Sequence, residues 1–143
     1  MTVFVDTGVF YAQQDEDTER HDAATRAMRA IAGGRFGRPV TSDYVYDETV
    51  TLTLSRSNDP EQAAAVGDRI RGHGRFPEVV RLLFVGGERF HDAVDIRRTY
   101  DDQALSFTDA TTVALVQDRD IDHVLSFDDD FDGIVDRLDP TAL

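Results

Sequence analysis

Four acidic residues stand beside short apolar segments, in contexts that isolated surface acids do not need. They are Asp6 in VFVDTG, Glu48 in YVYDETV, Asp109 in SFTDATTVAL and Asp128 in VLSFDDDF. A carboxylate at the end of a buried strand is costly unless it is paired or binds a cation. Mg²⁺ and Mn²⁺ prefer hard oxygen ligands, several of them charged. The four acids therefore predict a site for a divalent cation, Mg²⁺ or Mn²⁺.

The segments that must position these acids alternate between strands and helices. This alternation predicts an α/β fold in three layers, α/β/α, around a central and mostly parallel sheet. Ligands of such sheets bind beyond the carboxyl ends of the strands, where Asp6 and Asp128 are expected. Glu48 and Asp109 are expected near helix N-termini that can face the same edge. The predicted strands span 2–6, 39–41, 79–85, 123–126 and 134–138, and the predicted helices span 9–14, 18–32, 44–56, 60–72, 88–100 and 107–118.

Several positions carry signals for where a helix begins. Thr18 is the expected cap of the second helix, and Ser42 or Asp43 is the expected cap of the third. Ser106 or Thr108 is expected to cap the helix that carries Asp109. The apolar run VVRLLFV, at 79–85, is expected to form a buried strand.

Length and composition indicate a folded protein with a core of its own. The chain has 143 residues, of which 41% are hydrophobic, and we expect one domain spanning 1–143. No apolar run approaches the roughly 20 residues of a membrane span, and no signal peptide is recognisable at the start. There are no cysteines, which excludes disulfides and thiolate zinc sites. We therefore expect a cytoplasmic protein without a membrane partner.

The charge balance is strongly acidic. There are 28 acidic and 15 basic residues, giving a net charge of −13, and every basic residue is arginine. Such acidity ordinarily argues against a nucleic-acid partner. A lysine-free, aspartate-rich composition is, however, typical of haloarchaeal proteins, whose surface charges are screened by molar salt. On this interpretation the charge reflects a halophilic environment and says little about the ligand.

Taken in order, the four acidic motifs resemble those of the PIN-domain ribonucleases, and most closely the single-domain VapC-type toxins of toxin–antitoxin pairs. The similarity covers nearly the whole chain and consists of DTG at 6–8, YDE at 46–48, S-x-T-D-A at 106–110 and S-x-D-x-x-F at 126–131. It implies a PIN-like fold and a metal-dependent endoribonuclease. It also implies an RNA substrate, a small antitoxin protein as partner, and a homodimer.

The same resemblance implies roles for individual residues. Asp6, Glu48, Asp109 and Asp128 would be both the catalytic residues and the ligands of one or two Mg²⁺ or Mn²⁺ ions. The last motif favours Asp128 over its neighbours Asp129 and Asp130, with Asp130 as the alternative fourth acid.

Other polar residues are candidates for supporting roles. Thr7 and Ser106 could hydrogen-bond the carboxylates from outside the metal site. Arginines suited to phosphate contacts are expected near the site or on an adjoining helix, although a solvated or ion-paired role is the more common one. The four histidines lack the spacing of metal ligands. The arginines considered are Arg35, Arg38, Arg56, Arg97 and Arg98.

Alternative interpretations remain at this stage. Each acid could have a purely structural role: Asp6 and Asp128 in turns, Glu48 on an exposed helix face, and Asp109 at a helix N-terminus. Aspartate-nucleophile phosphatases and receiver domains also place an acid after the first strand, but both resemblances require a lysine that this chain lacks. A PIN-fold RNA-processing nuclease that is not a toxin, and a catalytically inactive PIN-fold binding module, also remain open.

Overall fold

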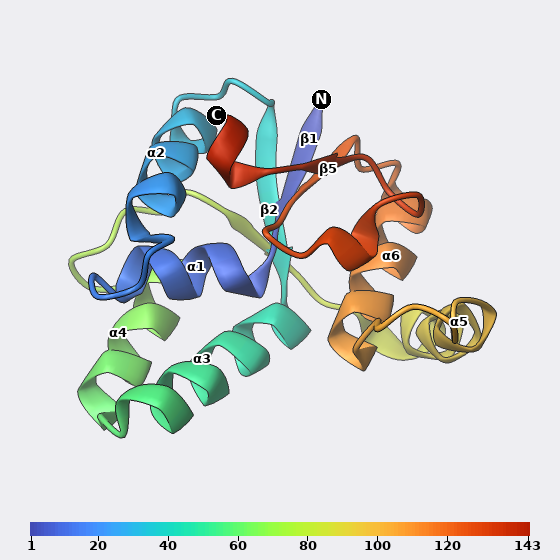
Figure 1. Ribbon diagram of the computed structural model, residues 1–143, viewed down its shortest axis with the longest axis horizontal. Coiled ribbons are helices and arrows are strands. Elements are labelled where there is room, and N and C mark those ends of the chain that lie inside the picture. The colour runs from blue at the N-terminus through green and yellow to red at the C-terminus, as the bar shows by residue number, and fades with distance from the viewer.

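Five parallel strands form one sheet in the computed structural model, which describes residues 1–143 (Figure 1). The order of the strands across the sheet is β3-β2-β1-β4-β5, and every neighbouring pair is parallel. This arrangement confirms the predicted α/β class with a parallel central sheet. The strands are β1 (Thr2–Val5), β2 (Arg38–Ser42), β3 (Arg81–Leu83), β4 (His123–Leu125) and β5 (Arg137–Leu138).

Strand β1 lies in the middle of the sheet and carries the centre of the core. Its residues Val3, Phe4 and Val5 are fully buried, as expected for a parallel strand covered on both faces. It pairs with β2 on one side and with β4 on the other. The backbone N–H of Asp6 donates to the carbonyl of Leu125 at 3.1 Å, so the pairing with β4 continues up to the point where the chain leaves the sheet.

Helices cover both faces of the sheet and complete three layers. Figure 1 shows α1, α2 and α4 on one side and α5 and α6 on the other, with α3 leaving the carboxyl end of β2. None of the helices is both long and apolar enough to cross a membrane. The α-helices are α1 (Thr7–Gln14), α2 (His21–Ala32), α3 (Asp43–Ser57), α4 (Pro60–Arg71), α5 (Gly86–Thr99) and α6 (Phe107–Arg119), and two 3₁₀ turns are η1 (Asp129–Phe131) and η2 (Pro140–Ala142).

Two helices that form the site begin where their sequences indicate. Ser42 caps α3, and its side chain accepts a hydrogen bond from the N–H of Val45 at 3.1 Å. Ser106 caps α6 in the same way, accepting from the N–H of Asp109. Both caps were among the predicted alternatives. They fix the direction in which each helix leaves the carboxyl edge of the sheet.

The structure corrects two of the predicted elements. The strand expected at 79–85 is only Arg81–Leu83, and it lies at the edge of the sheet with Phe84 beyond it 69% exposed. An apolar run does not distinguish a central strand from an edge strand, because strand order is a tertiary property. Helix α2 begins at His21 and not at Thr18, whose hydroxyl accepts from the N–H of Arg20 in the preceding turn.

Candidate active site

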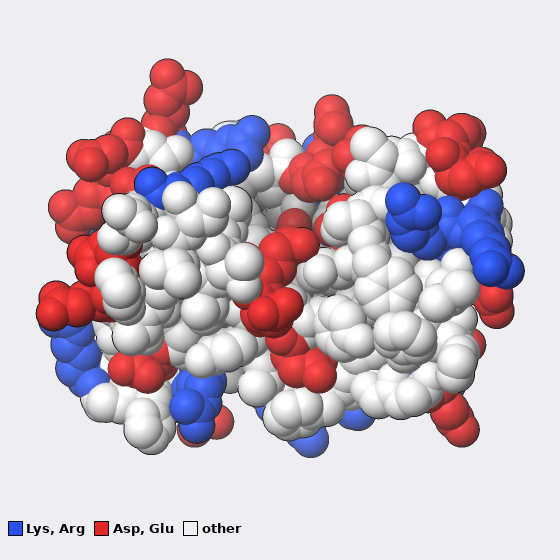
Figure 2. Space-filling model, turned by 90° about the horizontal axis from the view of Figure 1, so that it is seen from below, with Lys and Arg blue, Asp and Glu red and all other residues white.

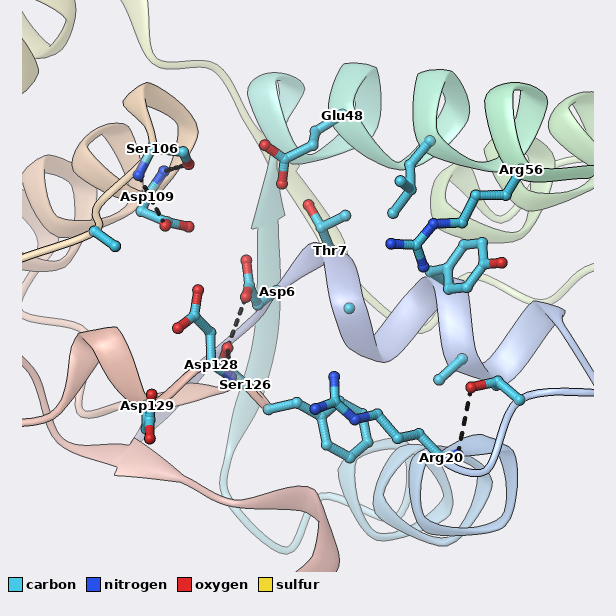
Figure 3. A pocket seen from close by; sticks show the side chains of 17 residues that line it. Asp6, Thr7, Arg20, Glu48, Arg56, Ser106, Asp109, Ser126, Asp128 and Asp129 are labelled. Atoms are coloured by element: carbon cyan, nitrogen blue, oxygen red, sulfur yellow. Dashed lines mark hydrogen bonds between the residues drawn. The ribbon is translucent and has the colours of Figure 1, made fainter.

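A pocket of about 610 Å³ opens at the carboxyl edge of the sheet and contains all four predicted acids (Figure 3). Its walls come from the junction of β1 and α1, from α3, from the start of α6, and from the segment after β4. In Figure 2, which views this edge, acidic side chains border a hollow in the surface. The lining residues are Asp6, Thr7, Gly8, Tyr11, Ala12, Thr18, Arg20, Glu48, Leu52, Arg56, Ala104, Ser106, Asp109, Ser126, Phe127, Asp128 and Asp129.

Asp6 lies at the centre of the site, directly after β1, and is only 5% exposed. Its Oδ2 accepts a hydrogen bond of 2.7 Å from the hydroxyl of Ser126. Its Oδ1 is buried and has no hydrogen-bond partner. Burial raises the pKa of Asp6 to about 6, while the hydrogen bond from Ser126 lowers it and the charges of Glu48 and Asp128 raise it further.

Asp109 lies in the first turn of α6 and is 6% exposed. Its Oδ2 accepts from the N–H of Ser106 at 3.1 Å, which completes a capping box. Asp109 therefore does stabilise the helix N-terminus, as its structural interpretation requires. Burial raises its pKa to about 7, with the charge of Asp6 as the next cause. A carboxylate that served only as a cap would not need to lie against a second buried acid.

Glu48 reaches the pocket from α3, on the wall opposite Asp128 (Figure 3). It is half-buried, and its side chain points from the helix toward Asp6. The charge of Glu48 contributes to the raised pKa values of both Asp6 and Asp109. The three carboxyl groups therefore share one electrostatic environment, although they come from segments far apart in the chain.

Asp128 and Ser126 connect β4 to the site. The N–H of Asp128 donates to the hydroxyl oxygen of Ser126 at 2.9 Å, and Oδ1 of Asp128 accepts from the N–H of Asp130 at 2.9 Å. Asp128 thereby caps the 3₁₀ turn η1, whose Phe131 is fully buried. Asp128 does occupy a turn, but it also lines the pocket that holds Asp6 and Asp109.

The run of three acids after β4 resolves differently from the sequence interpretation. Asp129, which the motif passes over, is exposed and lines the pocket, whereas the alternative fourth acid Asp130 does not. One carboxylate oxygen from each of Asp128, Asp129 and Asp130 lies within 4.8 Å of the others. The charge of Asp128 raises the pKa of Asp130. The direction of each side chain depends on the η1 turn, which a motif that constrains only its first and last acids does not specify.

The supporting polar groups also differ from those expected. Ser106 reaches Asp109 through its backbone N–H, while its hydroxyl accepts and does not donate. The hydroxyl of Thr7 is buried in the pocket wall without a hydrogen-bond partner. The hydroxyl that does bind a carboxylate belongs to Ser126. Its place two residues before Asp128, at the end of a predicted strand, was the available signal.

Among the arginines considered, only Arg56 lines the pocket. Arg35 and Arg38 lie before β2 and at its first residue, near the amino ends of the strands, so the prediction that they approach the active edge is wrong. Arg97 and Arg98 are exposed in the last turn of α5 and do not line the site. Arg20, which sequence reasoning did not single out, lines the pocket instead.

The donor atoms of this pocket fit a divalent cation. Several carboxylate oxygens converge in it, and Oδ1 of Asp6 is buried without any proton donor. Raised pKa values of Asp6 and Asp109 are those expected for acids placed together without a neutralising charge. Hard, anionic oxygen ligands with an open side suit Mg²⁺ or Mn²⁺. No histidine lines the pocket.

Comparison with protein families places this geometry in a known group. The family model described as the PIN domain matches residues 3–136, nearly the whole chain. The chain belongs to the PIN-domain family. This confirms the family resemblance of the sequence motifs, and the matched region includes every acid of the pocket.

Individual PIN-domain proteins are similar along most of their length. The 23S rRNA-specific endonuclease VapC20 of Mycobacterium tuberculosis is 29% identical over 129 residues, which is 90% of this chain and 91% of VapC20. The crystal structure of VapC20, described as a toxin that cleaves the sarcin–ricin loop, superposes with a TM-score of 0.75, covering 90% of this chain and 92% of that one.

More distant solved structures share the fold. VapBC2 from Rickettsia felis, bound to a promoter DNA fragment, is 10% identical with a TM-score of 0.69, covering 96% of this chain and 98% of the other. FitAcB from Neisseria gonorrhoeae is 13% identical with a TM-score of 0.68, covering 99% of both chains. At such low identity these two matches establish the PIN fold alone.

Proposed function

We propose that this PIN-domain protein is an Mg²⁺- or Mn²⁺-dependent endoribonuclease and the toxin of a type II toxin–antitoxin pair. The observation that carries the proposal is the convergence of Asp6, Glu48 and Asp109 in one pocket, where burial raises the pKa of two of them. Membership of the PIN family and the similarity to an rRNA-specific endonuclease support the choice of RNA as substrate.

The residues of the pocket suit phosphodiester hydrolysis. Asp6, Glu48, Asp109 and Asp128 would hold the cation, and Ser126 keeps the carboxylate of Asp6 in a fixed orientation. The bound cation would activate water and screen the negative charge of the transition state. Because ligand carboxylates must be ionised, cation binding releases the protons that Asp6 and Asp109 retain near pH 6–7 in its absence.

The direct test is RNA cleavage by the purified protein in high salt. We expect cleavage of structured RNA, ribosomal RNA among the substrates, with Mg²⁺ or Mn²⁺ and none in EDTA. Asp6→Asn, Asp109→Asn and Glu48→Gln should each abolish cleavage while the protein remains folded. These variants also control for a contaminating nuclease. Cleavage that continues in EDTA would rule out the metal-dependent mechanism.

The proposal includes a small antitoxin, a homodimer and a cytoplasmic location, where the RNA substrate is found. Solved relatives of the same fold include toxin–antitoxin complexes, among them one from Klebsiella pneumoniae at 15% identity. Tagged protein purified gently from its native host in high salt should carry a small inhibitory partner. Cleavage without such a partner would favour an RNA-processing PIN nuclease, and RNA binding without cleavage would favour an inactive binding module.

A further inference from the structure

Two arginines line the same pocket as the carboxylates. Arg20, immediately before α2, has its Cζ 4.8 Å from the centre of the Phe127 ring. Arg56, in the last turn of α3, has its Cζ 4.9 Å from the centre of the Tyr11 ring. Both rings also line the pocket. Figure 3 shows the two guanidinium groups entering from different walls, to one side of the acidic cluster.

Neither arginine is neutralised by the acids nearby. The only arginines that approach a carboxylate within 4.0 Å are Arg89 and Arg137, both outside this pocket. Stacking on an aromatic face holds a guanidinium in place by a cation–π contact and leaves its N–H edges free to donate. The carboxylates therefore remain available for a cation, and the two guanidinium groups remain available for an anion.

A second hollow of about 670 Å³ continues from the first and shares Tyr11 and Arg56 with it. Two more arginines line it, Arg69 and Arg75, and both lie over the ring of Phe76. The two hollows together can take an extended ligand that passes Arg56, and not only a single phosphate group.

We infer that Arg20 and Arg56 bind backbone phosphates of a single-stranded RNA segment, next to the phosphodiester that faces Asp6 and Asp109. The inference rests on the proposed function. A protein of net charge −13 repels RNA at a distance, and five carboxylates line this pocket. Local guanidinium contacts of the kind that position nucleic-acid backbones offset this repulsion. Arg20 and Arg56 are thus positioning residues, and they take no part in bond cleavage.

The test compares Arg20→Gln and Arg56→Gln with Arg35→Gln. Arg35 is a matched control because it is exposed and lies over a ring, that of Phe36, at 5.1 Å but outside the pocket. Steady-state cleavage of a single-stranded RNA should show KM raised roughly tenfold by each pocket variant, the loss expected for one charged hydrogen-bonding contact. The kcat should change little, and Arg35→Gln should leave both constants unchanged.

Equilibrium binding gives a second readout that does not require cleavage. In the Asp6→Asn background, a labelled RNA oligonucleotide should bind with a salt slope that is smaller by about 0.7 for each phosphate that the variant no longer binds. Arg20→Lys and Arg56→Lys should recover part of the affinity, because lysine keeps the charge but not the planar stacked group. Thermal melting of each variant checks that the fold is unchanged.

The outcomes separate this inference from the proposed function. RNA binding that is as strong in both pocket variants as in Arg35→Gln overturns the inference, even if the wild-type protein cleaves RNA. An effect on kcat alone also overturns it, as does weakened binding of a co-purified protein with RNA binding unchanged. A wild-type protein that binds but does not cleave RNA would refute the proposed nuclease activity, while the binding comparison would still test both arginines.

Discussion

The hydroxyl of Ser126 donates a 2.7 Å hydrogen bond to Oδ2 of Asp6 and accepts one of 2.9 Å from the N–H of Asp128. This buried side chain joins the ends of two neighbouring parallel strands, β1 and β4. It fixes one oxygen of Asp6 and leaves the other, Oδ1, without a protein partner. The relationship explains how a carboxylate can be almost completely buried and still present an oxygen to the pocket.

Removal of this hydroxyl should make Asp6 harder to ionise. The hydrogen bond from Ser126 lowers the pKa of Asp6 and so opposes the effect of burial. Ser126→Ala should therefore shift the pH midpoint of Mn²⁺ binding to higher pH, as measured by calorimetric titration at several pH values. Ser126→Thr, which keeps a hydroxyl, should stay close to the wild type. An alanine variant whose midpoint does not move would show that the hydrogen bond has no such effect.

The metal-free protein should lose stability as the pH rises through the range in which its buried acids ionise. Asp6 has a pKa of about 6 in the folded protein, against an ordinary value of 3.8, and Asp109 has one of about 7. Between these values the folded state binds more protons than the unfolded state, so the free energy of unfolding falls with rising pH. For Asp6 the loss is about 3 kcal/mol at most.

Asp6→Asn and Asp109→Asn should each flatten this pH dependence, because an amide does not titrate. Chemical denaturation of wild type and variants in metal-free buffer, over a pH series, measures the difference directly. Added Mn²⁺ should restore stability to the wild type at neutral pH and much less to either variant. If the wild type and the variants showed parallel pH profiles, the two carboxyl groups would not be the source of the effect.

The three acids after β4 should differ in their importance for cleavage. Asp128→Asn should nearly abolish activity, because Asp128 lines the pocket beside Asp6 and contributes to the raised pKa of that residue. Asp129→Asn should cause a partial loss, since its exposed carboxylate also lines the pocket. Asp130→Asn should have the smallest effect. Initial cleavage rates at saturating Mn²⁺ rank the three, and a larger loss for Asp130→Asn than for Asp128→Asn would reverse the assignment.

Salt should stabilise the fold if the protein comes from a halophile, which is a prediction that rests on composition. A net charge of −13 opposes compaction in dilute buffer, where the charges repel one another over long distances. In molar KCl the Debye length is about 3 Å and this repulsion is screened. The melting temperature should therefore rise markedly from dilute buffer to molar KCl. A flat or falling melting temperature would contradict the halophilic interpretation.

Local pattern was sufficient for most of the fold. The run Val3-Phe4-Val5 marks a strand buried on both faces, and Ser42 and Ser106 mark two helix starts that the structure confirms. These features depend on residues close together in the chain, so the sequence carries them directly. The four acids could be selected for the same reason: each follows a strand or begins a helix, and in a parallel sheet such positions meet at one edge.

Tertiary structure decided which side chains meet at that edge and which lie elsewhere. Strand order made Arg81–Leu83 an edge strand and placed Arg35 and Arg38 at the opposite end of the sheet from the pocket. The η1 turn directed Asp129 and not Asp130 into the pocket. Packing brought Arg20 over Phe127 from a distant segment. Such contacts join residues far apart in the sequence, so local periodicity cannot encode them; they follow only once the strands and helices are placed in space.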